Sequence, residues 1–187
     1  MSQIVDLVRE PLIVHTPRLM LRPLESRDAA QLLALFADPA VTEFMDIAPM
    51  TDLAEAAGVV DWANDRRAHN AGVRWGVRMA GEERLLGTCG FNLLELDRGR
   101  RGEVAYDLAP AHWGQGLASE ALSAVIGFGA QRLGLHRLEA MVTPGNTRSV
   151  RLLERHGFVR EGVLRDHGFW KGRFWDQMIY ARLAPFD

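Results

Sequence analysis

Apolar residues recur every three or four positions in three segments of the chain, and capping residues mark a further helix. Such spacing lines one face of a helix, so these segments are expected to pack on a core. Asp52 with Glu55 begins a helix that runs to about Asn70, while Asn146 and Gly157 bound the last one. The predicted helices span residues 29–36, 52–70, 117–128 and 147–156.

Between these helices, short apolar runs bounded by turn residues predict strands. They span residues 19–24, 73–79, 85–94, 103–108, 137–142, 158–164 and 175–183, with a polar turn at 98–102 and a connection at 168–173. Strands that alternate with helical crossovers favour an α/β or α+β fold of three layers. No repeat or linker interrupts the 187 residues, so one domain over 1–187 is predicted.

Composition narrows the class of protein. Apolar residues make up 48% of the chain and charged residues 25%, which is ordinary for a globular domain. The net charge of −2 offers no basic field for nucleic acid. Apolar runs stay far below the roughly 18 residues of a membrane span, and the start of the chain lacks a secretory pattern. We therefore expect a cytoplasmic protein without nucleic-acid or membrane partners.

The metal-binding residue types point to no metal site. The six histidines show no paired spacing of the kind that holds a metal ion. The single cysteine, Cys89, cannot form an internal disulfide, fits a reducing compartment and is expected to be a buried thiol.

The segment from Ala111 to Ala121 carries the clearest chemistry, because it leaves a strand, turns through two glycines and enters a helix. Glycine lets the backbone approach a ligand closely, and the free N–H groups of a helix start favour phosphate. A P-loop is excluded, since Leu117-Ala118 stand where Lys-Ser or Lys-Thr is needed. A Rossmann fingerprint is excluded, since Ser119 replaces its third glycine or alanine. The segment predicts a main-chain cradle for a pyrophosphate.

Three motifs in order resemble the GCN5-related N-acetyltransferase (GNAT) family, in particular its RimJ/RimL branch. Residues 113–118, Trp-Gly-Gln-Gly-Leu-Ala, match the family's Gln/Arg-x-x-Gly-x-Gly/Ala loop, with the tryptophan of that branch in place of Gln/Arg. Asn146-x-x-Ser149 and Gly157-Phe158 follow in the family's order, and residues 16–22 match its opening strand. The resemblance covers about 16–183 and implies a mixed, mostly antiparallel sheet flanked by helices.

The same resemblance implies acetyl-CoA as the co-substrate. The loop would hold its pyrophosphate, the strand end would pair with its pantetheine arm, and the main-chain N–H of Leu108 or Ala109 would stabilise the developing oxyanion. The implied cofactor-binding residues are Leu108, Trp113, Gly114, Gln115, Gly116, Leu117, Ala118 and Asn146.

Ser149 is the residue that the resemblance implies as proton donor to the departing thiolate. Its position in the first turn of a helix is equally explained by local capping. Tyr106 is an alternative acid, although strand alternation places it with Val104 and Leu108 in the core.

Glu139 is the candidate general base, because it is a carboxylate in an otherwise apolar strand, where burial makes a carboxylate more basic. A RimI-type relative carries Glu at the matching position. Pairing with Arg137 or Arg165 would instead make Glu139 structural. Gly168 stands where RimL-type enzymes carry their proposed base, so other carboxylates stay open. These are Glu103, Asp107 and Asp166.

The resemblance favours direct acetyl transfer within a ternary complex to a primary amine, first of all the N-terminal α-amine of a protein of ribosomal type. A small amine (a polyamine, an amino acid or an antibiotic) is the alternative acceptor, and a non-catalytic acyl-CoA-binding module is the alternative of another class. The chain is expected to be a monomer or a homodimer. Arg148, Arg151 and Arg155 share a helix face that is expected to be solvated rather than to clamp phosphate.

Overall fold

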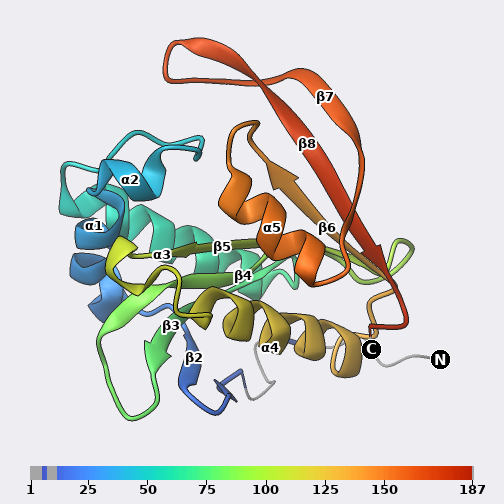
Figure 1. The fold of residues 1–187 in the computed structure, drawn as a ribbon. Coiled ribbons are helices and arrows are strands. Elements are labelled where there is room, and N and C mark those ends of the chain that lie inside the picture. Colours follow the sequence, from blue (N-terminus) through green and yellow to red (C-terminus); the bar gives the residue numbers. More distant parts are fainter. Residues whose placement is uncertain (1–5, 8–11, 187) are drawn as a thin grey trace.

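The computed structural model describes residues 6–7 and 12–186. In this part of the chain the strands form one sheet in the order β1-β2-β3-β4-β5-β6-β8-β7 (Figure 1). Its neighbouring strands are antiparallel except β5 and β6, which run parallel. The strands are β1 (Val14–His15), β2 (Leu19–Pro23), β3 (Val73–Met79), β4 (Leu85–Glu95), β5 (Arg101–Leu108), β6 (Arg137–Val142), β7 (Val159–Trp170) and β8 (Arg173–Leu183).

Helices cover both faces of the sheet, which gives the three layers predicted from the sequence (Figure 1). Helices α4 and α5 bury residues in one apolar cluster with the central strands, and α1 and α3 form a second cluster on the opposite face. The helices are α1 (Ala29–Phe36), α2 (Pro39–Thr42), α3 (Leu53–Ala68), α4 (Leu117–Gln131) and α5 (Thr147–Arg155). The fold class predicted from the sequence is confirmed.

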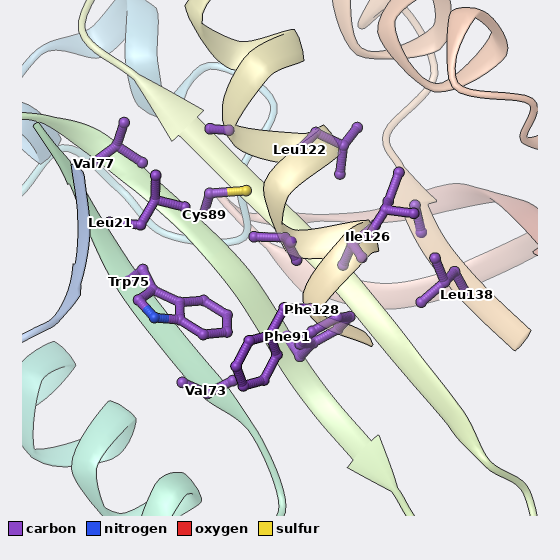
Figure 2. Close-up of a cluster of buried hydrophobic side chains, with 14 of the residues drawn as sticks. Leu21, Val73, Trp75, Val77, Cys89, Phe91, Leu122, Ile126, Phe128 and Leu138 are labelled. Carbon is purple, nitrogen blue, oxygen red and sulfur yellow. The ribbon is translucent and has the colours of Figure 1, made fainter. Parts of the chain in front are cut away.

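The larger core lies between α4 and the sheet. Figure 2 shows Leu122 and Ile126 of α4 above side chains of β3 and β4. The Trp75 ring meets Phe128 of α4 edge-on, with 5.1 Å between ring centroids, and its Nε1 donates to the carbonyl of Leu12. Because an indole buried with a satisfied N–H combines large apolar area with no polar penalty, Trp75 anchors α4 on the sheet.

Several boundaries differ from the predicted ones. β5 begins at Arg101, so the predicted polar turn at 98–102 partly belongs to the sheet, where Arg101 pairs with Glu95 and Arg137. The last hairpin is longer than predicted, with only residues 171–172 between β7 and β8. Its distal part is largely exposed, and the register between the strands shifts between Leu164 and Gly168. Strand alternation is imposed by burial of one face, so an exposed hairpin leaves little apolar signal.

A buried ion cluster fixes the start of α1 to the sheet. The Asp28 carboxylate, 1% exposed, receives hydrogen bonds from Arg78 of β3 at 2.6 Å and from Arg22 of β2 at 3.1 Å. Burial alone would raise the pKa of Asp28, but the Glu25 main-chain N–H and these two guanidinium groups outweigh it and hold that pKa below its usual value. Arg78 is fully buried, so its charge depends on this carboxylate.

Asp28→Ala is expected to destabilise the protein by about 3–5 kcal/mol, because it leaves the fully buried Arg78 without a carboxylate partner. Glu83→Ala is the control, since Glu83 also pairs with Arg22 but its side chain is 68% exposed; it should cost under about 1 kcal/mol. A lowered pKa adds stability above the unfolded value, and this stability is lost as pH falls through the folded pKa. Urea unfolding should therefore show a steeper acid loss for wild type than for Asp28→Ala. Equal losses for the two variants at neutral pH would contradict this role.

Candidate active site

The parallel strands β5 and β6 separate after a short stretch of pairing. Residues 101–103 of β5 pair with 137–139 of β6, and beyond this point 104–108 pair only with β4 and 140–142 only with β8 in the described chain. The backbone groups along this β5–β6 gap therefore have no strand partner. An extended molecule that entered the gap would meet hydrogen-bonding edges of the kind that bind an added strand.

The glycine loop (residues 113–118) lies at the open end of β5. Gly114 and Gly116 have φ of +74° and +75°, a left-handed conformation that other residues adopt only with strain. Helix α4 begins directly afterwards, and its first internal bond runs from the Glu120 N–H to the Gly116 carbonyl at 3.0 Å. The N–H groups of residues 117–119 thus have no acceptor inside the helix. Together with the positive end of the helix dipole they form a site suited to phosphate.

Trp113 fixes the geometry between the strand end and this loop. Its Nε1 donates to the carbonyl of Leu108 at 2.6 Å. The sequence left open whether Leu108 or Ala109 supplies a free N–H, and here the Ala109 N–H donates to Leu86 of β4 at 2.8 Å. Because successive N–H groups of a strand point to opposite edges, the Leu108 N–H faces the gap. Leu108 is therefore the better placed of the two donors.

Arg18 supports the loop from the other side and was not identified as a site residue from the sequence. Its Nη1 donates to the Gln115 carbonyl at 3.0 Å, and its Nε pairs with Glu120 at 2.6 Å. Arg18 belongs to the 16–22 motif, so that motif contained the signal. The contact ties the chain ahead of β2 to the first turn of α4.

Ser149 and Tyr106, proposed from the sequence as alternatives, lie together. Their hydroxyl oxygens are 2.7 Å apart, with Tyr106 on β5 and Ser149 in the first turn of α5. The Asn146 side chain caps α5 by accepting from the Ser149 N–H at 3.1 Å, which places Asn146 beside this hydroxyl pair in sequence and in the first turn of the helix. Burial raises the pKa of Tyr106 well above its usual value, which keeps the phenol protonated. The two walls of the gap are thus bridged by a pair of proton donors.

Glu139 lies at the closed end of the gap, 8% exposed. One carboxylate oxygen accepts from Arg137 Nε at 2.5 Å, and the other accepts from Arg101 at 3.3 Å. Arg137 in turn pairs with Glu161 of β7. These contacts match the alternative in which Glu139 pairs with Arg137 and holds strands together, and they leave its oxygens little freedom to accept a proton from a substrate.

Glu103 lies beside Glu139 in the parallel register and differs from it in one respect. Within the described residues its carboxylate makes no hydrogen bond or ion pair. Burial raises the pKa of Glu103, and the charge of Glu139 adds to this, while Arg66, His167 and Arg101 act in the opposite direction. A carboxylate that is desolvated and unpaired has the properties of a general base.

The two remaining carboxylates are less suited to that role. Asp107 is held by Arg74 Nη2 at 2.6 Å and by the Thr88 hydroxyl at 2.7 Å, which joins β5 to β3 and β4. Asp166 is exposed in the distal part of β7, with φ of +47°. The network around Asp107 instead stabilises the strand whose far edge lines the gap.

The tip of the β7–β8 hairpin returns to the body of the protein through Lys171. Its Nζ donates to the main-chain carbonyls of Thr42 and Glu43 at 2.5 and 3.2 Å. The Thr143 hydroxyl donates to the carbonyl of Phe44 at 2.9 Å, so residues 42–44 contact both the hairpin and the loop before α5. This strap (residues 42–44 with Lys171) was not predicted, because neither segment carries a sequence pattern that indicates their contact.

Other residue types at the site suggest no further chemistry. In the described part of the chain no cluster of histidine, cysteine or acidic side chains is arranged to hold a metal ion. Cys89 is buried, as expected, and burial raises the pKa of its thiol. No described helix combines the length and apolarity required to cross a membrane.

Comparison with known proteins gives consistent results. A family model described as an acetyltransferase (GNAT) domain matches residues 18–159. An uncharacterized N-acetyltransferase, p20, of Bacillus licheniformis is 39% identical over 170 residues, covering 91% of this chain and 95% of that protein. A ribosomal-protein-serine acetyltransferase of Escherichia coli is 34% identical over 102 residues, covering 54% of this chain and 56% of that protein.

Solved structures share the fold. A structure described as RimL, a ribosomal alpha-N-protein acetyltransferase, in complex with coenzyme A superposes with a TM-score of 0.83 at 21% identity, covering 94% of this chain and 99% of that one. At this identity the likeness concerns the fold. The family model, however, covers the glycine loop, the β5–β6 gap and the Tyr106–Ser149 pair in one match. The chain accordingly belongs to the GNAT family of acetyltransferases and is an acyltransferase.

Proposed function

We propose that this protein is an N-acetyltransferase that moves an acetyl group from acetyl-CoA to a primary amine, by direct transfer in a ternary complex. The observation that carries the proposal is the β5–β6 gap, with the glycine loop at its mouth and two hydroxyl groups across it. The residues fit the co-substrate, since a phosphate site and a slot with unpaired strand edges adjoin each other. Acetyl-CoA would supply an acetyl group on a thioester.

The residues on the two walls of the gap bind different parts of acetyl-CoA. The N–H groups of residues 117–119 receive the pyrophosphate, while the edges of β5 and β6 hold the pantetheine arm. Asn146 caps α5 through its side-chain oxygen, and its amide N–H groups are the donors that we assign to the arm. The Leu108 N–H, directed into the gap, donates to the thioester carbonyl oxygen as negative charge develops there.

Tyr106 and Ser149 protonate the departing sulfur. The phenol is held in its protonated form, and either hydroxyl of the pair can donate to the other. In the arrangement that we propose for catalysis Tyr106 donates, which leaves the serine hydroxyl proton free to move to the thiolate. A proton donor positioned in this way matters only as the carbon–sulfur bond breaks, so its effect falls on turnover rather than on binding.

Glu103 is the base that takes the proton of the attacking amine. Successive side chains of a strand point to opposite faces, so Glu103 and Tyr106 lie on opposite faces of β5. The contacts agree, because Tyr106 meets Ser149 of α5 whereas Arg66 of α3 acts on Glu103. Three residues of strand span roughly 10 Å, a separation that one or more waters bridge for proton transfer. The amine thus approaches from one face of the sheet and the sulfur is protonated on the other.

The N-terminal α-amine of a protein is the acceptor that we favour. Relatives named ribosomal-protein-serine and ribosomal-protein-alanine acetyltransferases share 34% and 30% identity over 102 and 104 residues. The long β7–β8 hairpin also carries two exposed aromatics, Phe169 and Phe174, which offer contact area for a macromolecule. A small-molecule amine is the second candidate, because the strap ties the tip of this hairpin to residues 42–43 and so limits the room beside it for a large acceptor.

A thiol-release assay with acetyl-CoA and a panel of acceptors tests the function. Peptides with free Ser or Ala N-termini should be acetylated with a kcat/KM at least tenfold above that of spermidine or free amino acids. N-terminally blocked versions of the same peptides, which retain any lysine side chain, serve as the control. Preference for spermidine would assign the small-amine function, and binding of acetyl-CoA without turnover of any acceptor would indicate a non-catalytic module.

Ser149→Ala is expected to lower kcat by roughly 10²–10⁴ while KM for acetyl-CoA stays nearly unchanged, because a positioned acid acts in the transition state. Tyr106→Phe should lose less, since the serine hydroxyl remains. If Tyr106 acts through Ser149, the double variant will be no slower than Ser149→Ala alone. A slow Tyr106→Phe beside a nearly normal Ser149→Ala would make the tyrosine the proton donor.

Glu103→Gln is expected to remove the acid limb of the pH–rate profile. A raised pKa means that the wild-type carboxyl becomes an active base only above its ordinary range, so the rate should rise with pH through that value. The variant should be slowest relative to wild type near neutral pH and recover at high pH, where an α-amine with pKa about 7.7–8.0 deprotonates by itself. Glu139→Gln, the matched control, should lower the melting temperature and keep the acid limb, displaced toward lower pH because a charge that raises the pKa of Glu103 is removed. The reverse pattern would return the base to Glu139.

A further inference from the structure

Arg148 differs from Arg151 and Arg155 on the same helix, because its side chain makes a specific contact with an aromatic ring. The sequence predicts a solvated face for Arg148, Arg151 and Arg155. In the structure the Arg148 guanidinium carbon lies 4.2 Å from the centroid of the Trp113 ring. Trp113 belongs to the glycine loop after β5, and Arg148 to the first turns of α5 after β6. The stack therefore crosses from one wall of the β5–β6 gap to the other.

The platform beneath this arginine is rigid. Trp113 donates its Nε1 to the Leu108 carbonyl at 2.6 Å and its main-chain N–H to Pro110 at 3.1 Å. A guanidinium lying over an indole face is held without using its N–H donors, which stay directed outward in the plane of the group. Arg148 is thus positioned but retains its capacity to bind a planar or tetrahedral anion.

The charges around the loop differ between its two sides. Arg18, on one side, is paired with Glu120, so its charge is compensated. Arg148, on the other side, forms no ion pair with any carboxylate in the described part of the chain. Of these two arginines that contact the glycine loop, Arg148 is the one whose charge is not compensated by a carboxylate in the described chain.

We propose that Arg148 is a phosphate-binding residue of the acetyl-CoA site, and that its stack on Trp113 closes the mouth of the gap over the bound arm. The inference rests on the proposed function. It adds to it one phosphate-binding residue and the closure of the gap by the Arg148–Trp113 stack. Coenzyme A carries phosphate in two places, the pyrophosphate and the ribose 3′-phosphate. The guanidinium fork suits either, since both present paired oxygens.

Calorimetry with coenzyme A, 3′-dephospho-coenzyme A and pantetheine tests the proposal. Arg148→Ala should lower the affinity for coenzyme A at least tenfold. It should also reduce the dependence of this affinity on NaCl concentration, because one charge contact is lost. Arg155→Ala removes the same charge two helical turns away and should bind coenzyme A within about twofold of wild type. Arg148→Lys, which keeps the charge but not the planar fork, should lie between them.

The fragments distinguish the phosphates. If Arg148→Ala also lowers the affinity for 3′-dephospho-coenzyme A tenfold, Arg148 binds the pyrophosphate. If the variant and wild type bind 3′-dephospho-coenzyme A equally, Arg148 binds the 3′-phosphate. Both results support the proposal. The proposal would be overturned if the Arg148→Ala variant bound coenzyme A with the same affinity as the Arg155→Ala variant. The proposal would also be overturned if Arg148→Ala lowered the affinity for pantetheine, which has no phosphate, as much as the affinity for coenzyme A. Arg148 would then only shape the gap. If wild-type protein fails to bind coenzyme A at all, the proposed function itself is wrong.

Discussion

The separation of β5 from β6 is the constraint on which the rest of the site depends. Parallel strands normally continue their pairing, and unpaired edges inside a sheet leave backbone donors and acceptors unsatisfied. Here three residues of each strand pair, and then each strand keeps only its outer neighbour. The gap persists because each wall is fixed from outside. Arg74, Asp107 and Thr88 bind β5 to the strands beside it, and β8 pairs with β6 along its whole length.

A gap through a sheet connects the two layers of helices that the sheet would otherwise separate. On the α4–α5 face lie the glycine loop, the hydroxyl pair and the Arg148–Trp113 stack. On the α1–α3 face lies the desolvated carboxylate of Glu103. Because side chains of one strand alternate between faces, β5 alone supplies groups to both faces of the sheet beside the gap. This geometry allows an acyl donor and an amine acceptor to approach from different sides without competing for space.

The carboxylates illustrate how environment assigns roles to chemically identical groups. Asp28, Asp107 and Glu139 are all largely buried, and each is held by arginine. They join strands to one another or to a helix. Glu103 is a half-buried carboxylate that lacks such a partner in the described chain, and it lies at the gap. Desolvation of a carboxylate without a partner carries a cost, so its presence at this position is more readily explained by chemistry than by stability.

The sequence determined the elements with a buried face, since apolar periodicity follows directly from burial. Helices α1, α3, α4 and α5 and the central strands were found within a few residues of their boundaries. It also determined the glycine loop, because positive φ at Gly114 and Gly116 demands that residue type locally. The exposed distal part of the β7–β8 hairpin was misjudged, as no buried face marks it.

Tertiary structure decided which residues meet. Tyr106 and Ser149 are 43 residues apart, and only the folding of α5 onto β5 joins them. The choice between Leu108 and Ala109 depended on a hydrogen bond to Leu86 of another strand. Glu139 and Glu103 look alike in sequence, and the arginines that distinguish them come from two strands. Sequence fixes local conformation through short-range sterics and periodic burial, whereas pairing, desolvation and charge compensation arise only when distant segments pack together.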